Sequence, residues 1–385
     1  MSRLFRLLST AVAVPILSVA FVTAPAGSRP ASAAAAAGAT RPADFAAQSI
    51  TWISPTQGWM LGKATCGAGT CTEVVGTTNG ARTWHVDGVL QAPLVQYRHP
   101  GVSGLRFANA RIGWAFGPSL HVTTDGGHTW ARQRVPGGGR RILSLAADRD
   151  QAIAVVAMCS QRKPFSECRK GTTLWRSSPP GSPWKKASIA LPPAFQAVAE
   201  VHGETGYVVI PNERLRHGAF VATTDGATWS PRRNPCRTDR DEMLLSVAPI
   251  TDTRVALECV AAIGFGKGVK HAYRSNDAAT STRSAGVAPL LGINTQIAAA
   301  PNGTIAMATY SIGSWIYRNA RGTAWTTSAD LGDGGEGWND IDFTTNTTGF
   351  VIHGPEAMFG PGELWGTTNG GLTYAVLPVS PLDKA

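Results

Sequence analysis

The sequence predicts an all-β fold, specifically a seven-bladed β-propeller, on three observations. A short turn motif recurs along the chain, and an apolar run precedes each copy of it. The composition also combines 43 glycines and 12 tryptophans in 385 residues. Many turns and many large flat side chains are typical of all-β repeat proteins, where glycine forms turns and aromatic rings fill the space between sheets.

The motif begins with two threonines and ends with an aromatic residue. Its copies are Thr77–Trp84, Thr123–Trp130, Thr367–Tyr374 and the shorter Thr223–Trp229. We expect each copy to form a tight turn between antiparallel strands, in which Asp or Asn accepts backbone hydrogen bonds, glycine supplies positive φ and the ring packs on a neighbouring sheet. These structural residues are Asn79, Trp84, Asp125, Gly127, Trp130, Asp225, Trp229, Asn369, Gly371 and Tyr374, whereas Ala81 replaces the glycine of the first copy.

Degenerate copies bring the count of motifs to seven. Ser177–Trp184 keeps the glycine and the tryptophan, Ser275–Asp277 keeps the beginning, and Gly322 with Trp325 keeps the end. The copies then end near residues 84, 130, 184, 229, 282, 325 and 374, a mean period of roughly 48 residues, which is in the range of propeller blades.

The apolar runs also number seven, so two separate patterns give the same blade count. Short apolar runs bounded by turn residues indicate strands buried on both faces, as in stacked blades. The runs are Gly58–Leu61, Gly113–Phe116, Ala152–Val155, Gly206–Val209, Arg254–Leu257, Gly303–Ala306 and Gly349–Ile352.

Each blade is expected to have four strands, the motif lying before the last. In the second blade they are Leu105–Ala108, Trp114–Gly117, Leu120–Thr124 and Trp130–Arg134. One such sheet cannot bury both faces alone, so the blades must stack into a ring. The pattern leaves open whether residues near 44–48 complete the last blade.

The first residues have the features of an export signal. Arg3 and Arg6 precede an apolar segment that Pro15 interrupts, and Ala24-Pro25-Ala26 offers a cleavage site. We expect a signal peptide at 1–26, with cleavage as late as 33 as the alternative, an Ala/Gly/Pro-rich linker at 27–43 and the propeller at 44–380. The apolar segment is too short and broken for a membrane anchor, so we expect a secreted protein with no integral membrane segment after cleavage.

Six cysteines follow the signal, an even number that favours disulfides in an exported chain. Pairing of sequence neighbours is the simplest of fifteen connectivities and gives Cys66–Cys71, Cys159–Cys168 and Cys236–Cys259. Spacing typical of cysteine–histidine zinc sites does not occur.

The chain is basic, with a formal charge of +10 that falls by two when Arg3 and Arg6 are removed. Such a charge suits association with an anionic cell wall, or it keeps a large domain soluble. Arg140-Arg141 and Arg232-Arg233 lie among Pro and Gly without interleaved aromatic residues, so nucleic acid is not the expected partner.

One acidic segment, residues 330–342, is a candidate site. We interpret it first as a solvated connecting loop. The alternatives are a Ca²⁺ site formed by Asp330, Asp333, Glu336 and Asp340, or a catalytic carboxylate pair drawn from the cluster Asp330, Asp333, Glu336, Asp340 and Asp342. The histidines at 85, 121, 128, 202, 271 and 353 stand singly and are interpreted as hydrogen-bonded fold residues. No cofactor motif is present, and none is expected to bind.

The four motif copies and the glycine–aromatic strand starts (Gly58-Trp59, Gly113-Trp114, Gly206-Tyr207, Gly349-Phe350) resemble the BNR/Asp-box propeller superfamily, most closely its Ycf48/Hcf136-like members. The resemblance implies a propeller fold. It leaves function open, because the superfamily contains sialidases, other glycosidases, receptors and assembly factors. Sialidases have an Arg-Ile-Pro-like motif, which this sequence lacks, and no Glu lies near Tyr310 or Tyr317 before Glu336.

The sequence therefore favours a secreted, monomeric, non-catalytic binding or assembly propeller. Its rim loops or central channel would bind a protein or a cell-envelope glycan. A cell-surface glycoside hydrolase with an unrecognised carboxylate pair is the alternative, and a carbohydrate-binding propeller is a third possibility.

Overall fold

A computed structural model describes residues 45–95, 101–139, 141–157, 171–211, 218–355, 362–379 and 382–383. These residues form seven antiparallel sheets, which are the blades of a propeller. Blade 1 comprises β1 (Phe45–Trp52), β2 (Gly58–Cys66), β3 (Gly69–Thr77) and β4 (Trp84–Leu90). Blade 2 comprises β5 (Gly104–Phe107), β6 (Gly113–Phe116), β7 (Leu120–Thr123) and β8 (Ala131–Gln133). Blade 3 comprises β9 (Arg141–Ala147), β10 (Ala152–Ala157), β11 (Thr172–Ser177) and β12 (Lys185–Lys186). Blade 4 comprises β13 (Val198–His202), β14 (Thr205–Ile210), β15 (Ala219–Thr223) and β16 (Ser230–Pro231). Blade 5 comprises β17 (Met243–Pro249), β18 (Val255–Gly264), β19 (Lys267–Ser275) and β20 (Arg283–Ala288). Blade 6 comprises β21 (Asn294–Ala299), β22 (Ile305–Tyr310), β23 (Ser314–Asn319) and β24 (Thr326–Leu331). Blade 7 comprises β25 (Trp338–Phe343), β26 (Gly349–His353), β27 (Glu363–Thr367) and β28 (Ala375–Val376).

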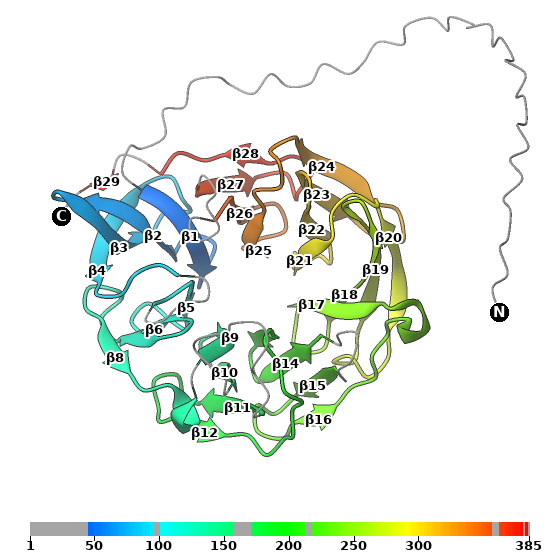
Figure 1. Cartoon of the computed structure of the whole chain (residues 1–385), viewed down its shortest axis with the longest axis horizontal. Coiled ribbons are helices and arrows are strands. Elements are labelled where there is room, and N and C mark those ends of the chain that lie inside the picture. Colours follow the sequence, from blue (N-terminus) through cyan, green and yellow to red (C-terminus); the bar gives the residue numbers. More distant parts are fainter. Residues whose placement is uncertain are drawn as a thin grey trace, which may run out of the picture. The chain divides into compact units, whose positions relative to one another are not determined.

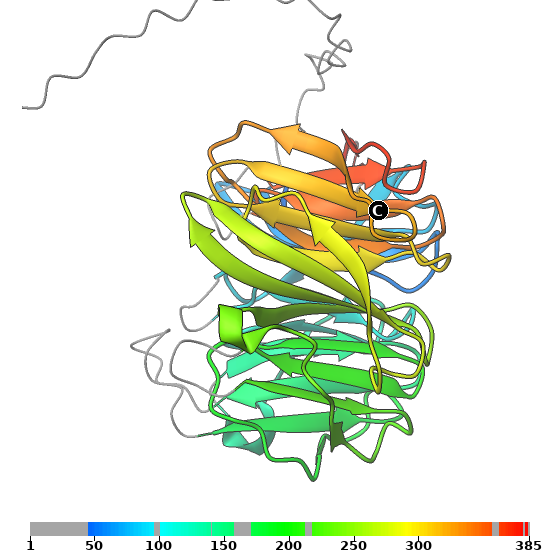
Figure 2. The same ribbon diagram turned by 90° about the vertical axis from the view of Figure 1, so that its right-hand side faces the viewer.

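Each blade contains a four-stranded meander that runs from the centre of the ring outward, and the first blade has a fifth strand. The first strand of every blade lies nearest the central axis, and the fourth lies at the rim (Figure 1). Seen edge-on, the strands run between two faces on which the connecting turns lie (Figure 2). The predicted seven-bladed, all-β fold is confirmed. In the described part of the chain, the only helical turns are two 3₁₀ segments, Pro136–Gly138 and Thr238–Arg240.

Both ends of the propeller chain lie in blade 1. The strand β1 is the inner strand of that blade, and the short β29 (Leu382–Asp383) pairs in parallel with β4 at its outer edge. Residues 45–48 therefore belong to the first blade and not to the last. The final strand lies just beyond residue 380, where the sequence placed the end of the domain.

The predicted apolar runs overlap the second strand of each blade. All six residues of β10 and of β14 are buried, which is expected for a strand covered by a neighbouring blade on either side. Aromatic pairs join adjacent blades: the rings of Trp59 and Phe107 stack at 3.9 Å between blades 1 and 2, and those of Trp52 and Phe350 at 4.2 Å between blades 1 and 7.

The recurrent motifs form the expected turns before the outer strands. In the second blade, Asp125 Oδ1 accepts a hydrogen bond from the Thr129 amide at 2.9 Å, and Thr123 Oγ1 accepts one from the Gly127 amide at 2.9 Å. Asn79, Asp225 and Asn369 accept the equivalent bonds in their blades. Glycine at the fifth position has positive φ (Gly127, 106°), and Ala81 adopts the same region at 67°.

The fifth-blade turn is more complete than its sequence suggested. Asp277 Oδ1 accepts the Ser281 amide at 2.9 Å, Ser275 Oγ accepts the Ala279 amide at 2.9 Å, and alanines 278 and 279 take the positive-φ positions. Hydroxyl and carboxylate groups at the right spacing therefore form the turn without its glycine or its aromatic residue.

Two disulfides lie in the described residues. Cys66–Cys71 links β2 to β3 next to the turn between them, and Cys236–Cys259 attaches the segment before β17 to β18. Both agree with the neighbour pairing. Cys159 and Cys168 lie outside the described residues, as do the signal peptide and the linker. Within the described ranges, no helix has the length and apolarity to cross a membrane.

Candidate binding site on the propeller axis

Four of the seven inner strands, as described, contain a β-bulge: β1, β9, β17 and β25. At each bulge, a polar side chain accepts a hydrogen bond from a backbone amide of the next blade's inner strand. The pairs of acceptor and donor are Ser49 with Leu105, Ser144 with Ala199, Ser246 with Ile297, and Asp340 with Ile50, all between 3.0 and 3.1 Å. A bulge interrupts the regular alternation of side chains along a strand and changes the direction in which one of them points. The bulges therefore allow these polar groups to reach the adjacent blade.

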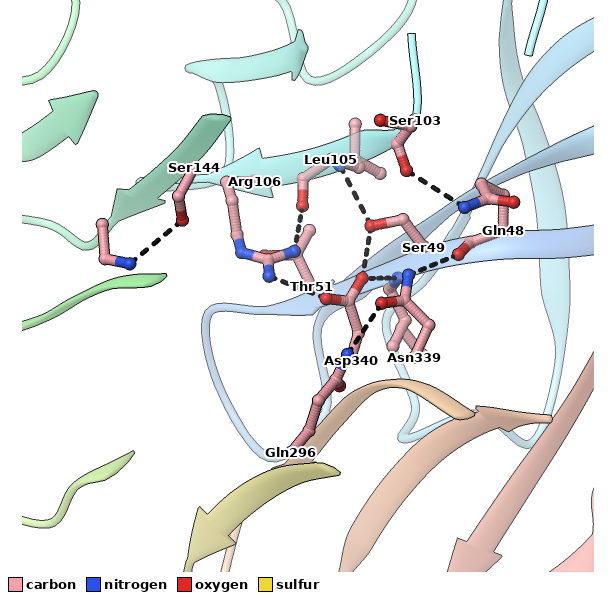
Figure 3. A network of polar contacts seen from close by, with 12 residues as sticks. Gln48, Ser49, Thr51, Ser103, Leu105, Arg106, Ser144, Gln296, Asn339 and Asp340 are labelled. Atoms are coloured by element: carbon pink, nitrogen blue, oxygen red, sulfur yellow. Dashed lines mark hydrogen bonds and ion pairs between the residues drawn. The ribbon is translucent and has the colours of Figure 1, made fainter. Parts of the chain in front are cut away.

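Asp340 is the charged member of this set and has the most partners (Figure 3). Its Oδ2 accepts bonds from the Ile50 amide and the Ser49 hydroxyl, and its Oδ1 lies 2.7 Å from Arg106 Nη2. Burial lowers the pKa of Arg106, but the Asp340 carboxylate outweighs this and raises it above its ordinary value. Arg106 is therefore a permanent cation held on the axis.

Two further carboxylates, Glu200 on β13 and Asp342 on β25, share the electrostatic environment of Arg106. Burial raises the pKa of Glu200 to about 8, against an opposing effect of Arg106. Burial also raises the pKa of Asp342, to about 6, although this side chain is exposed and keeps part of its solvation. Of the two carboxyl groups, Glu200 therefore has the higher pKa.

A pocket of about 650 Å³ lies where the inner strands of blades 1 to 4 end. Its apolar wall includes Trp52, Ile53 and Phe107. Its polar wall contains more acidic than basic groups, and these are Asp148, Asp150, Glu204 and Asp252 against Arg149 and His202. An acidic pocket on a chain with a net positive charge is a local feature that favours a cationic group.

Hydrogen bonds hold several of the acidic groups of this axial pocket. Asp148 Oδ1 accepts the amides of Asp150 and Gln151, and burial raises the pKa of Asp148 above its ordinary value. Asp252 lies 3.0 Å from His202 Nδ1. The loops that carry these groups are therefore ordered by their own side chains before any ligand binds.

The acidic segment between blades 6 and 7 does not come together as one site. Asp340 points to the axis, and Asp330 lies exposed on β24. Asp333 and Glu336 instead meet His353, with ligand atoms of all three within 4.8 Å of one another. His353 has the hydrogen bond expected of it, to Asp333, and it is isolated only in the sequence, because β26 ends beside this acidic loop.

Three other described histidines lie beside a carboxylate or a carbonyl oxygen. His85 and His271 lie 3.0 Å from Asp87 and Glu242, respectively. His128 Nδ1 lies 3.1 Å from the Asp87 carbonyl. The structural interpretation of these histidines agrees with their contacts.

Sequence reasoning missed Arg106 and Glu200. A signal was available: each is a charged residue inside a short inner strand, in Leu105-Arg106-Phe107 and Ala199-Glu200-Val201. A charge at such a position must face the axis or be paired. The bulges that bring Asp340 to Arg106 leave no comparable mark in the sequence.

Comparison with solved structures agrees with the fold. No family model and no curated protein matches the chain. The structure is similar to that of YCF48 bound to a D1 peptide, with a TM-score of 0.52 and 16% identity over 86% of this chain and 95% of that one. It also matches a GH74 xyloglucanase from Xanthomonas campestris, with a TM-score of 0.31 and 11% identity over 86% of this chain and 72% of the other. At these identities, the likeness to YCF48 establishes a shared seven-bladed propeller architecture and nothing finer.

Proposed function

We propose that the chain is an exported, non-catalytic binding or assembly propeller of the Ycf48-like BNR-repeat type, and that it takes a protein segment in the axial pocket. The observation that carries this proposal is the chemistry of the pocket. An apolar wall faces four carboxylates, which suits an extended segment with Lys or Arg next to apolar residues. The YCF48 neighbour, which has a peptide partner, supports a protein ligand for a propeller of this architecture.

The binding test uses short peptides that differ only in having Lys/Arg or Ala beside apolar residues. We expect the basic peptides to bind, with an affinity that falls as salt rises. The double variant Asp150→Asn/Glu204→Gln should weaken binding by about tenfold, whereas Asp239→Asn, an exposed acidic residue outside the pocket, should not. Equal binding of the basic and alanine peptides would contradict the proposal.

A glycoside hydrolase is the second candidate because Glu200 and Asp342 have pKa values of about 8 and about 6. One protonated and one ionised carboxyl group is the combination that glycoside hydrolysis uses. Turnover of a sialoside or a plant polysaccharide that is lost in Glu200→Gln and in Asp342→Asn would establish this function in place of the first. Turnover that both variants retain would come from a contaminating enzyme.

A further inference from the structure

The cluster around His353 lies on the face of the propeller opposite the axial pocket. His353 ends β26, beside the first residue of β25, whereas the pocket is formed where the inner strands end. The imidazole is 4% exposed and packs against two tryptophan rings, with centroid distances of 4.7 Å to Trp338 and 5.7 Å to Trp365. The His353 imidazole is therefore held in place by packing and is largely shielded from solvent.

One nitrogen of this imidazole has a short hydrogen bond. His353 Nε2 lies 2.6 Å from Asp333 Oδ2, and the other carboxylate oxygen of Asp333 accepts the Gly335 amide at 2.9 Å. Asp333 is thus anchored by its own loop. In the neutral ring whose Nε2–H donates to Asp333, Nδ1 carries the lone pair.

The other nitrogen, Nδ1, is buried and has no hydrogen-bond partner. Two carboxylate oxygens face it beyond hydrogen-bond reach, Glu363 Oε2 at 3.7 Å and Glu336 Oε2 at 4.0 Å. Trp365 Nε1 donates to the same oxygen of Glu363 at 3.2 Å and helps to orient it. A buried ring nitrogen left unsatisfied is costly, so this arrangement needs an explanation.

We propose that His353 Nδ1, Glu336 and Glu363 bind a divalent transition-metal ion such as Zn²⁺, and that Asp333 orients the histidine. Zinc binds imidazole nitrogen and carboxylate oxygen at about 2.0–2.2 Å, so two ligand atoms on a tetrahedral ion lie about 3.4 Å apart. The observed separations of 3.7 and 4.0 Å exceed this by only a few tenths of an ångström. Glu336, with its side chain 40% exposed, has room to close the difference.

The Asp333–His353 contact supports this assignment independently. A metal-bound histidine almost always donates its other N–H to a carboxylate or a carbonyl, which fixes the tautomer and makes the ligand more basic. Two carboxylates also neutralise the charge of the ion. The site differs from the calcium site considered from the sequence, since an imidazole ligand favours Zn²⁺ over Ca²⁺, which takes six to eight oxygens.

Calorimetric titration of the chelator-treated chain with ZnCl₂ and CaCl₂ tests the proposal. We expect one Zn²⁺ per chain, with tighter binding than Ca²⁺, and a higher Tm with Zn²⁺ present. Glu336→Gln should weaken Zn²⁺ binding by at least about tenfold, because it removes a charged ligand, and Asp333→Asn by about 10- to 100-fold. Asp330→Asn is the matched control, since it removes the same charge from an exposed position nearby and should leave binding unchanged.

Substitution with Co²⁺ gives a second readout. The visible absorption of the bound Co²⁺ should change in His353→Gln, and far-UV circular dichroism verifies that each variant is folded. Absence of Zn²⁺ binding, equal binding by Glu336→Gln and the parent chain, or tighter binding of Ca²⁺ than of Zn²⁺ would each overturn the proposal.

Discussion

Arg106 of blade 2 and Asp340 of blade 7 form an ion pair, with 2.7 Å between Nη2 and Oδ1, although blade 1 lies between these two blades in the ring. Three consecutive blades are thereby connected through one carboxylate, since Asp340 also binds Ser49 and the Ile50 amide of blade 1. The pair lies where the first and last blades of the ring meet.

Replacing Asp340 with Asn should destabilise the propeller by about 2–3 kcal/mol. This is somewhat less than the loss for a fully buried ion pair, because the Arg106 side chain is 24% exposed. Asn suits this position because Asp340 has a φ of 51°, which Asn tolerates. Urea unfolding measures the change.

Ser144→Ala is the matched control for Asp340→Asn. It removes a neutral acceptor with the same role between blades 3 and 4, so it should cost about 1 kcal/mol. Equal losses in the two variants would mean that the charge of Asp340 adds nothing to closure of the ring.

Glu258 should make the stability of the propeller fall as pH rises. Its carboxyl group is fully buried on β18, and burial raises its pKa from 4.5 to about 8, against the opposing effects of Thr295 and Lys270. The folded state then binds a proton that the unfolded state releases, so this contribution to stability declines between about pH 4.5 and pH 8 and levels off above that range.

The variant Glu258→Gln has a neutral side chain that resembles the protonated acid. In urea unfolding at a series of pH values, its free energy of unfolding should decline less with rising pH than that of the parent chain. Glu200 shifts in the same direction and remains in the variant, so part of the decline should persist. The exposed Glu204→Gln is the control. A decline as steep in Glu258→Gln as in the parent chain would show that Glu258 ionises normally.

Asp277→Ala should lower the Tm in an acid-sensitive way. Hydrogen bonds from the Ser281 hydroxyl and amide lower the pKa of Asp277 to about 2. Its contribution is therefore present above pH 3.8 and is lost as pH falls through about 2. The Tm difference between variant and parent, measured by calorimetry, should vanish at the acid end, while Asp239→Ala should show no such dependence.

The two described disulfides should differ in their contribution to stability. Cys236–Cys259 spans 23 residues and Cys66–Cys71 spans 5. Chain entropy predicts losses of about 3 and about 2 kcal/mol when each pair is replaced by alanines. Urea unfolding of the two double variants tests this, and a larger loss for the Cys66–Cys71 pair would contradict the loop-length argument.

Much of the propeller could be predicted because its signals are local. A Thr/Asp/Gly/Trp turn, and an apolar run such as Ala152–Val155, specify a strand or a corner within a few residues. The turn at Ser275 was underestimated because its hydrogen bonds need only a hydroxyl and a carboxylate, so alanine can replace glycine at modest strain.

The candidate sites could be predicted only in part, because they depend on contacts over long sequence separations. Asp333 and Glu336 were recognised as candidates, but their histidine follows from the path of β26. Asp340 was grouped with them in sequence, yet a bulge turns it toward Arg106, 234 residues away. Composition and spacing contain no information about such a bulge.

The alternation of bulged and regular inner strands has a consequence for how many blades this ring can hold. A ring with an even number of blades can alternate without interruption, but in a ring of seven two strands of the same kind must be neighbours, and here they are the bulged strands β25 and β1. Asp340 lies where these two bulged strands meet. Its Oδ2 accepts hydrogen bonds from both the Ser49 hydroxyl and the Ile50 amide, while its Oδ1 pairs with Arg106. Gaining or losing a single blade would let bulged and regular strands alternate without interruption, and Asp340 would then no longer face a bulged strand that offers it the Ser49 hydroxyl.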